Sequence, residues 1–302
     1  MTLALAFVAH TAWTLYRRWE PGRLHVDAWL VILSALPLAL GVLLQAWAWV
    51  RLVRRMSGVP VAMLAGLKLY FDSQLARYAP GKVGLPLVRI EGGVRLGLGA
   101  ALVGSSILAE VLCWAVVGGA LSVLVIVATG SQKSPLFAML SDYAVPLLVL
   151  FTLGLLVLVL VDRQRFPAFA LRWLRIDGEG PLVPVDLPII FVGHWATWAV
   201  HGYLISRAGG APPEDATSAI GAFLVAPLGG FLIVAAPAGL GVREALLSLA
   251  LAPSIGSAGA LATALLSRLC TLAAEVACWA ALHASATPGL EHVEKDHSEG
   301  SK

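Results

Sequence analysis

Two glutamates lie in nearly repeated apolar sequence, and both are candidates for proton chemistry. Residues 109–115 read AEVLCWA and residues 274–280 read AEVACWA, so Glu110 and Glu275 hold the same place in the two copies. A carboxylate in an apolar helix is costly unless it is paired, protonated or in contact with water, and intramembrane ionisable residues commonly mark functional sites. We predict that the two glutamates are coupling groups that take up protons or face a substrate. The alternative is a hydrogen-bonded fastening between helices.

A second repeat lies upstream of each glutamate and interrupts a helix. Residues 79–84 read APGKVG and residues 236–241 read APAGLG. Proline and glycine in such positions break a helix, and the half-helix that follows presents free N–H groups that attract anions. The predicted structural breaks are Pro80, Gly81, Gly84, Pro237, Gly239 and Gly241.

Cationic residues flank these breaks and the second glutamate, and they are candidates for binding a phosphate. The predicted substrate-binding set is Arg77, Lys82, Arg89, Arg243 and Arg268. Arg268 lies two helical turns before Glu275, where it either binds a phosphate or neutralises a carboxylate. Glu244 directly follows Arg243 and is a third candidate coupling group. The alternative for Arg89 and for Arg243 with Glu244 is an ion pair that snorkels to the membrane interface, as we expect for Arg95.

The composition indicates an integral membrane protein. Of 302 residues, 59% are apolar and 13% are charged, and the mean hydropathy is +0.84. Soluble domains carry about 25% charged residues. The net charge of +3 is too small to indicate a nucleic-acid partner.

Motifs for enzymes and metal sites are missing from the sequence. The three cysteines lack C-x-x-C spacing, and His194 and His201 have no third ligand at metal spacing. We expect the two histidines to pack in the membrane beside the aromatic belt. With no nucleophile elbow or Walker loop, we predict no catalytic residue, no metal and no cofactor.

Apolar runs predict an all-α fold of about six transmembrane helices, at 1–16, 28–50, 100–128, 139–161, 187–206 and 255–285. Residues 61–97 and 217–252 carry charges and Pro/Gly breaks within apolar sequence. Such backbone is tolerated at membrane depth only against protein or a wet cavity. We predict that both segments are re-entrant helical hairpins whose tips meet near the middle of the bilayer.

These segments form a single transmembrane domain, 1–286, built as an inverted repeat. Its halves are residues 1–130 and 139–286, approximately, and residues 287–302 form a polar tail that we expect to be disordered. Basic residues slightly favour a cytoplasmic placement of both termini in the cytoplasmic membrane.

The residues around the two breaks carry a resemblance to a known family. The stretch RYAPGKVG at 77–84, followed by Arg89, resembles the flippase-like membrane family typified by the transmembrane domain of lysylphosphatidylglycerol synthases. The stretch APAGLGVRE at 236–244 is similar to that family's second hallmark. Leu85 and Val111 depart from the acidic and basic residues that the family pattern places there. The resemblance covers residues 25–285, approximately. It implies translocation of a lipid headgroup or of an isoprenoid-phosphate-linked sugar, without the soluble aminoacyl-transferase domain.

Three functions are consistent with these residues. We expect a lipid flippase or secondary transporter that moves an anionic phospholipid or an isoprenoid-phosphate-linked lipid between leaflets. The alternatives are a non-transporting accessory subunit that recruits a lipid-modifying enzyme, and an intramembrane enzyme that acts on lipid-linked phosphates. A charged cavity open to lipid and water favours transport, and charges packed against one another favour the accessory role. The expected partners are a membrane lipid with an anionic headgroup and a lipid-modifying enzyme, with no nucleic acid.

Overall fold

A computed structural model describes residues 26–78, 83–129, 134–160, 186–233 and 239–284 of the chain, and these residues form helices and their connections. In chain order the helices are α2 (Ala28–Ser57), α3 (Met63–Ala76), α4 (Gly84–Arg95), α5 (Ala100–Thr129), α6 (Pro135–Ser141), α7 (Ala144–Leu160), α9 (Asp186–Ala208), the 3₁₀ turn η4 (Pro213–Asp215), α10 (Ala216–Leu232) and α11 (Val242–Ala284).

Several of these helices are long and apolar enough to cross a membrane. Four qualify by length and composition: Ala28–Ser57, Ala100–Ala128, Pro213–Leu232 and Val242–Ala284. A fifth is added if α6 and Ala144–Val157, which are bent by 69° relative to each other, count as one span. Large apolar side chains such as Leu36, Val145 and Leu232 are exposed, as is expected for a surface that faces lipid. The chain is therefore a helical integral membrane protein, with four or five candidate spans among the residues that the structure describes.

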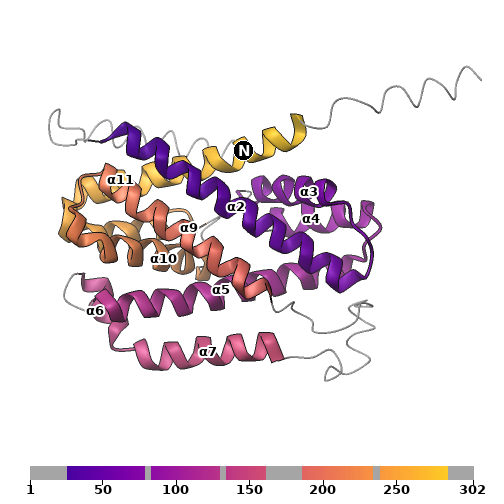
Figure 1. Ribbon diagram of the computed structural model, residues 1–302, viewed down its shortest axis with the longest axis horizontal. Helices are drawn as coiled ribbons and strands as arrows, with labels where there is room; N and C mark the ends of the chain where they lie inside the picture. The colour runs from indigo at the N-terminus through magenta and orange to yellow at the C-terminus, as the bar shows by residue number, and fades with distance from the viewer. Residues whose placement is uncertain (1–25, 79–82, 130–133, 161–185, 234–238, 285–302) are drawn as a thin grey trace, which may run out of the picture.

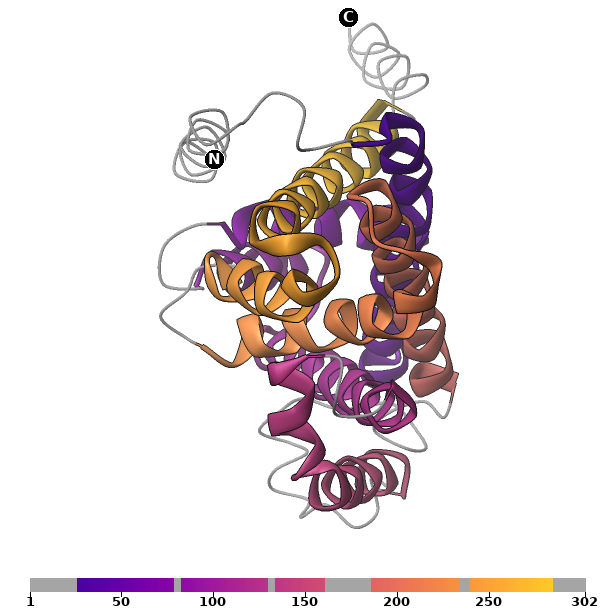
Figure 2. The ribbon, with the colours of Figure 1, turned by 90° about the vertical axis from the view of Figure 1, so that its left-hand side faces the viewer.

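The helices form a layered bundle around α9 and α2. Figure 1 shows α2 and α9 running across the molecule, with α5 below them and α7 beneath α5. In the orthogonal view of Figure 2, α10 lies between α11 and α5. The close contacts rely on small residues: a Cβ at Gly118 would meet Trp195 of α9 at 2.2 Å, and one at Gly119 would meet Phe151 of α7 at 2.3 Å.

The segments expected as re-entrant hairpins, 61–97 and 217–252, each contain two helical segments, but Pro213–Leu232 and α11 of the second are themselves long and apolar enough to cross a membrane. In the first segment, α3 and α4 pack side by side, and in the second α10 packs against α11. The backbone of α11 is not helical at Gly256, where φ is 71° and ψ is 162°. This break divides α11 into an arm of the second hairpin and a longer segment that carries Arg268 and Glu275.

The expected spans agree with the helices to different degrees. Those at 28–50, 100–128 and 255–285 fall on α2, α5 and the second segment of α11, which belong to candidate membrane spans, whereas the one at 187–206 falls on α9, which is not among the candidates found in the described residues. The span at 139–161 is bent instead of continuous, because α6 ends at Ser141 and α7 begins at Ala144. Pro146 contributes to this bend, since it has no N–H to bond the carbonyl of Asp142. The spans and tail expected at 1–16 and 287–302 lie outside the described residues.

Candidate functional site

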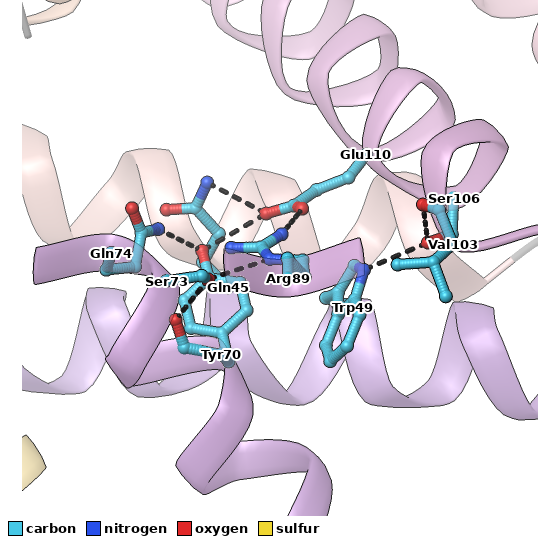
Figure 3. A network of polar contacts seen from close by, with 9 residues as sticks. All are labelled: Gln45, Trp49, Tyr70, Ser73, Gln74, Arg89, Val103, Ser106 and Glu110. Carbon is cyan, nitrogen blue, oxygen red and sulfur yellow. Dashed lines mark hydrogen bonds and ion pairs between the residues drawn. The ribbon is translucent and has the colours of Figure 1, made fainter. Parts of the chain in front are cut away.

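Glu110 lies at the centre of a buried polar cluster drawn in Figure 3. Its Oε2 forms an ion pair with Nη1 of Arg89 at 2.6 Å, and both side chains are at most 4% exposed. Its Oε1 accepts hydrogen bonds from the Tyr70 hydroxyl at 3.1 Å and from the Gln45 amide at 3.3 Å. Helices α2, α3, α4 and α5 thus all contribute to one carboxylate, and we call this set the Glu110 cluster.

Aromatic rings and hydroxyls hold Arg89 in place in the Glu110 cluster. The guanidinium carbon lies 4.3 Å from the centre of the Tyr70 ring and 4.8 Å from that of the Trp49 ring. Its Nε donates to Ser73 Oγ at 2.9 Å, and Trp49 in turn donates to Ser106 on α5. These charges pack tightly against one another, which is the arrangement expected for an accessory role.

Glu275 is also buried, but its cation comes from the other half of the chain. Arg77, the C-cap of α3, forms an ion pair with Oε1, and the Tyr78 hydroxyl donates to Oε2 at 3.2 Å. The Arg77 side chain is 28% exposed, whereas that of Glu275 is 2% exposed. The contact joins the end of the first hairpin helix to the second segment of α11.

Arg268 and Glu244 extend this group across α11. Nη1 of Arg268 lies 3.7 Å from Oε1 of Glu244, and the guanidinium sits over the Tyr78 ring at 5.5 Å. Glu244 Oε2 accepts from the backbone N–H of Gly241 at 2.7 Å, which fixes the start of α11. The pairing of Arg268 with a carboxylate agrees with one of its two expected roles, although the carboxylate is Glu244 and not Glu275.

Arg243 differs from the other buried arginines of the described chain in its surroundings. It is 5% exposed, its Nη2 donates to Ser267 Oγ at 2.6 Å, and its guanidinium lies 5.0 Å from the Trp198 ring centre. Within the described residues, no carboxylate lies within 4.0 Å of Arg243, whereas Arg77, Arg89 and Arg268 each have one; its Nε has no hydrogen-bond partner, as is also true of one nitrogen each of Arg77 and Arg89. Arg268 and Arg77 are near enough to repel its charge, and Glu244 is near enough to attract it without forming an ion pair. A buried guanidinium in such a position is a site for an anion.

His201 supports Arg243 through Ser267. The His201 Nδ1–H donates to the backbone carbonyl of Ser34 at 3.0 Å, so Nε2 is left to accept from Ser267 Oγ at 2.9 Å. Because Ser267 donates its hydroxyl proton to His201, its oxygen accepts the hydrogen bond from Arg243 Nη2. The sequence analysis assigned His201 to packing alone. His194 and His201 are spaced i, i+7, which places both on one face of α9 and could have indicated a shared neighbouring helix. Both rings bond backbone carbonyls of α2.

The structure thus divides the predicted site residues between two places. Arg89 belongs to the Glu110 cluster, and what we call the arginine cluster consists of Arg77, Arg243, Arg268, Glu244 and Glu275. The arginine cluster holds three guanidinium groups and two carboxylates. Arg95 forms the expected exposed pair with Glu91, at 2.6 Å.

The predicted breaks are described in part. Gly84 begins α4, and Gly239 and Gly241 have positive φ angles of 69° and 82°. Pro80, Gly81, Lys82 and Pro237 lie outside the described residues. Among the described residues, no group of three His, Cys, Asp or Glu side chains is arranged to hold a metal ion.

Comparison with known proteins does not identify a family. No protein-family model matches the chain, and no curated protein matches it significantly. The assignment that the sequence and the geometry allow is a helical membrane protein with four or five candidate spans and two buried clusters of charge.

Proposed function

We propose that this protein moves a lipid with an anionic phosphate headgroup between membrane leaflets, and that Arg243 binds the phosphate. The observation that carries the proposal is that Arg243 is buried without a carboxylate partner among the described residues. Removing a guanidinium from water without a counter-charge is costly, and a bound phosphate would supply that charge.

The position of Arg243 supports an anion site over a structural role. Arg243 is the second residue of α11, directly after the break of the second hairpin, where the helix dipole is positive and Glu244 Oε2 accepts from the Gly241 N–H. The guanidinium is held from one side by Ser267 and Trp198, so its remaining donors keep a fixed direction. The resemblance of residues 236–244 to the flippase-like family points the same way.

The proposed architecture follows from the same pattern. The α3–α4 and α10–α11 pairs are re-entrant hairpins that enter from opposite sides of the cytoplasmic membrane, within an inverted repeat of about six spans. Both termini lie on the cytoplasmic side. Arg77 and Arg268 lie in the same cluster as Arg243 and complete the phosphate site. Three guanidinium groups face two carboxylates there, so one positive charge is left for the phosphate.

An accessory role without transport is the second candidate, and one observation favours it. The charges of the Glu110 cluster are fully packed against aromatic rings and hydroxyls. That half of the molecule therefore has the properties expected of a scaffold.

Lipid binding and lipid movement test the proposal together. The protein is purified in mild detergent, the co-purified lipids are identified by native mass spectrometry, and fluorescent phosphatidylglycerol and phosphatidylcholine are followed in proteoliposomes. We expect bound anionic lipid, and movement of phosphatidylglycerol in preference to the zwitterionic lipid. Arg243→Ala should weaken binding about tenfold or more, the value of a charge-assisted hydrogen bond.

Two further variants complete the experiment. Arg243→Lys keeps the charge but loses the planar fork, so we expect intermediate binding. Arg95→Ala removes an exposed arginine of a surface pair and is the matched control. Binding and movement that are equal in Arg243→Ala and Arg95→Ala would refute the phosphate site.

A further inference from the structure

A pocket of about 150 Å³ lies at the base of the second hairpin, apart from the arginine cluster. Its polar lining comes from Asp215 and Ser218 at the start of α10 and from Ser254 on the first segment of α11, while alanine and leucine side chains complete the wall. A space of this size holds several water molecules or a partly hydrated ion.

The side chain of Asp215 does not cap the helix that follows it. It is the N-cap of α10, where an aspartate usually accepts from the backbone N–H groups of the first turn. Here its side chain makes no such capping bond, and its Oδ2 accepts from Ser254 Oγ at 2.6 Å. The carboxylate therefore faces the other arm of the hairpin across the pocket.

Ser218 provides an independent indication of a ligand. It lines the pocket, is 5% exposed, and its Oγ has no hydrogen-bond partner among the described residues. A buried hydroxyl without a partner is costly, and such groups in folded proteins usually mark a bound water or ion.

The backbone of α11 adds acceptors at the same place. Pro253 has no N–H, and the break at Gly256 ends the helical segment just beyond Ser254. The last carbonyls of a helical segment lack intrahelical N–H partners, and the carboxyl end of a helix carries partial negative charge. This end of the α11 segment favours a cation, and the Asp215 carboxylate offsets the partial positive charge at the start of α10.

We propose that this pocket binds a sodium ion between Asp215, Ser218, Ser254 and carbonyls of the α11 break. All of these ligands are hard oxygens, and the pocket offers one carboxylate to one positive charge. Calcium sites generally use more carboxylates, and zinc or copper sites use His or Cys, neither of which lines this pocket.

The location of the site gives the ion a role, which rests on the proposed lipid transport. Ser254 follows Arg243 by eleven residues, which is roughly 16 Å along a helix. An ion held between the start of α10 and Ser254 fixes the two arms of the hairpin at its base, while Arg243 binds the headgroup near its tip. Broken helices of secondary transporters bind their coupling ions with such carbonyl ends. Sodium is then a coupling ion in addition to the protons expected at Glu110 and Glu275.

Ion binding is measured on the full-length protein in sodium-free detergent solution. We expect sodium chloride, but not choline chloride at equal ionic strength, to raise the melting temperature in a saturable way, and radioactive sodium to bind with the same dependence. Asp215→Asn and Ser218→Ala should each weaken sodium binding about tenfold or more. Glu214→Gln is the control, because it removes a carboxylate from the adjacent residue, which does not line the pocket. Ser218→Ala keeps the test valid if Asp215→Asn does not fold.

Separate outcomes distinguish the site from the function. No difference between sodium and choline, or equal binding by Ser218→Ala and wild type, would show that the pocket holds water only. Sodium binding with no effect of a sodium gradient on lipid movement would uphold the site and contradict its coupling role. Sodium binding in a protein that moves no lipid would contradict the proposed function and leave the site intact.

Discussion

Arg77 and Glu275 are separated by 198 residues and form an ion pair that joins the first hairpin to the last helix. The corresponding glutamate, Glu110, is paired with Arg89 from its own half. Equivalent positions of the repeat therefore have different partners. The Glu110 pair holds one half of the protein together, whereas the Glu275 pair connects the two halves.

The Arg89–Glu110 pair should contribute strongly to stability once one partner is lost. Arg89→Met leaves Glu110 buried without its cation, which costs about 3–5 kcal/mol in comparable buried pairs. The double variant Arg89→Met/Glu110→Leu removes both charges and should recover most of that loss. Thermal unfolding in detergent measures both. Arg95→Ala, in an exposed pair, should cost about 1 kcal/mol or less. A single variant as stable as this control would contradict the assignment.

The two glutamates should also differ in their effect on transport if they couple proton uptake to lipid movement. Glu110→Gln and Glu275→Gln each hold one protonation state, so each should make lipid movement insensitive to an imposed pH gradient. Glu275→Gln also frees Arg77, the more exposed of the two paired arginines, and should change lipid affinity as well. The assay compares proteoliposomes with and without a gradient. A double Gln variant that still responds to the gradient would remove both carboxylates from the mechanism.

The sequence predicted those features that depend on local pattern. Helices α3, α4 and α10 lie beside the Pro/Gly breaks that interrupt apolar sequence at 79–84 and 236–241. The burial of Glu110 and Glu275 follows from their apolar neighbours and is confirmed.

Partners that depend on tertiary packing could not be predicted. Arg77 reaches Glu275 because α3 packs against α11, and no local pattern specifies which of several arginines meets which glutamate. The role of His201 depends on the contact of α9 with both α2 and α11. A histidine close to tryptophans on an apolar helix is ordinarily a packing residue, and only the two hydrogen bonds of His201 show otherwise.

Gly239 should be more sensitive to substitution than Gly241, although both have positive φ angles. A Cβ at Gly239 would lie 3.0–3.1 Å from backbone atoms of Gly230, whereas one at Gly241 would meet nothing within 4 Å. Gly241→Ala should therefore cost only the backbone strain of about 1–2 kcal/mol, and Gly239→Ala should cost more because the hairpin arms must separate. Thermal unfolding of the two variants tests this order. Equal melting temperatures would contradict the close approach of Gly239 to Gly230.

His201 should affect lipid binding through the position of Arg243, and His194 should not. His194 lies two turns earlier on α9 and bonds the Gly41 carbonyl and Trp114, with no contact to Arg243 among the described residues. Both His→Phe variants remove a side-chain hydrogen bond to a buried carbonyl of α2, so both should lose about 0.5–1.5 kcal/mol of stability. Only His201→Phe should also weaken binding of anionic lipid, because Ser267 then loses the acceptor that fixes its hydroxyl.

Two conservative variants of His201 separate positioning from packing. The terminal group of Gln reaches the place of Nε2 and can accept from Ser267, whereas the terminal group of Asn reaches only the place of Nδ1 and can donate to the Ser34 carbonyl. His201→Gln should therefore retain lipid affinity while losing the bond to α2, and His201→Asn should show the reverse. Native mass spectrometry gives the affinity and thermal unfolding gives the stability. If affinity follows stability across all four variants, His201 supports the fold only, and the chain from Ser34 to Arg243 does not position the phosphate site.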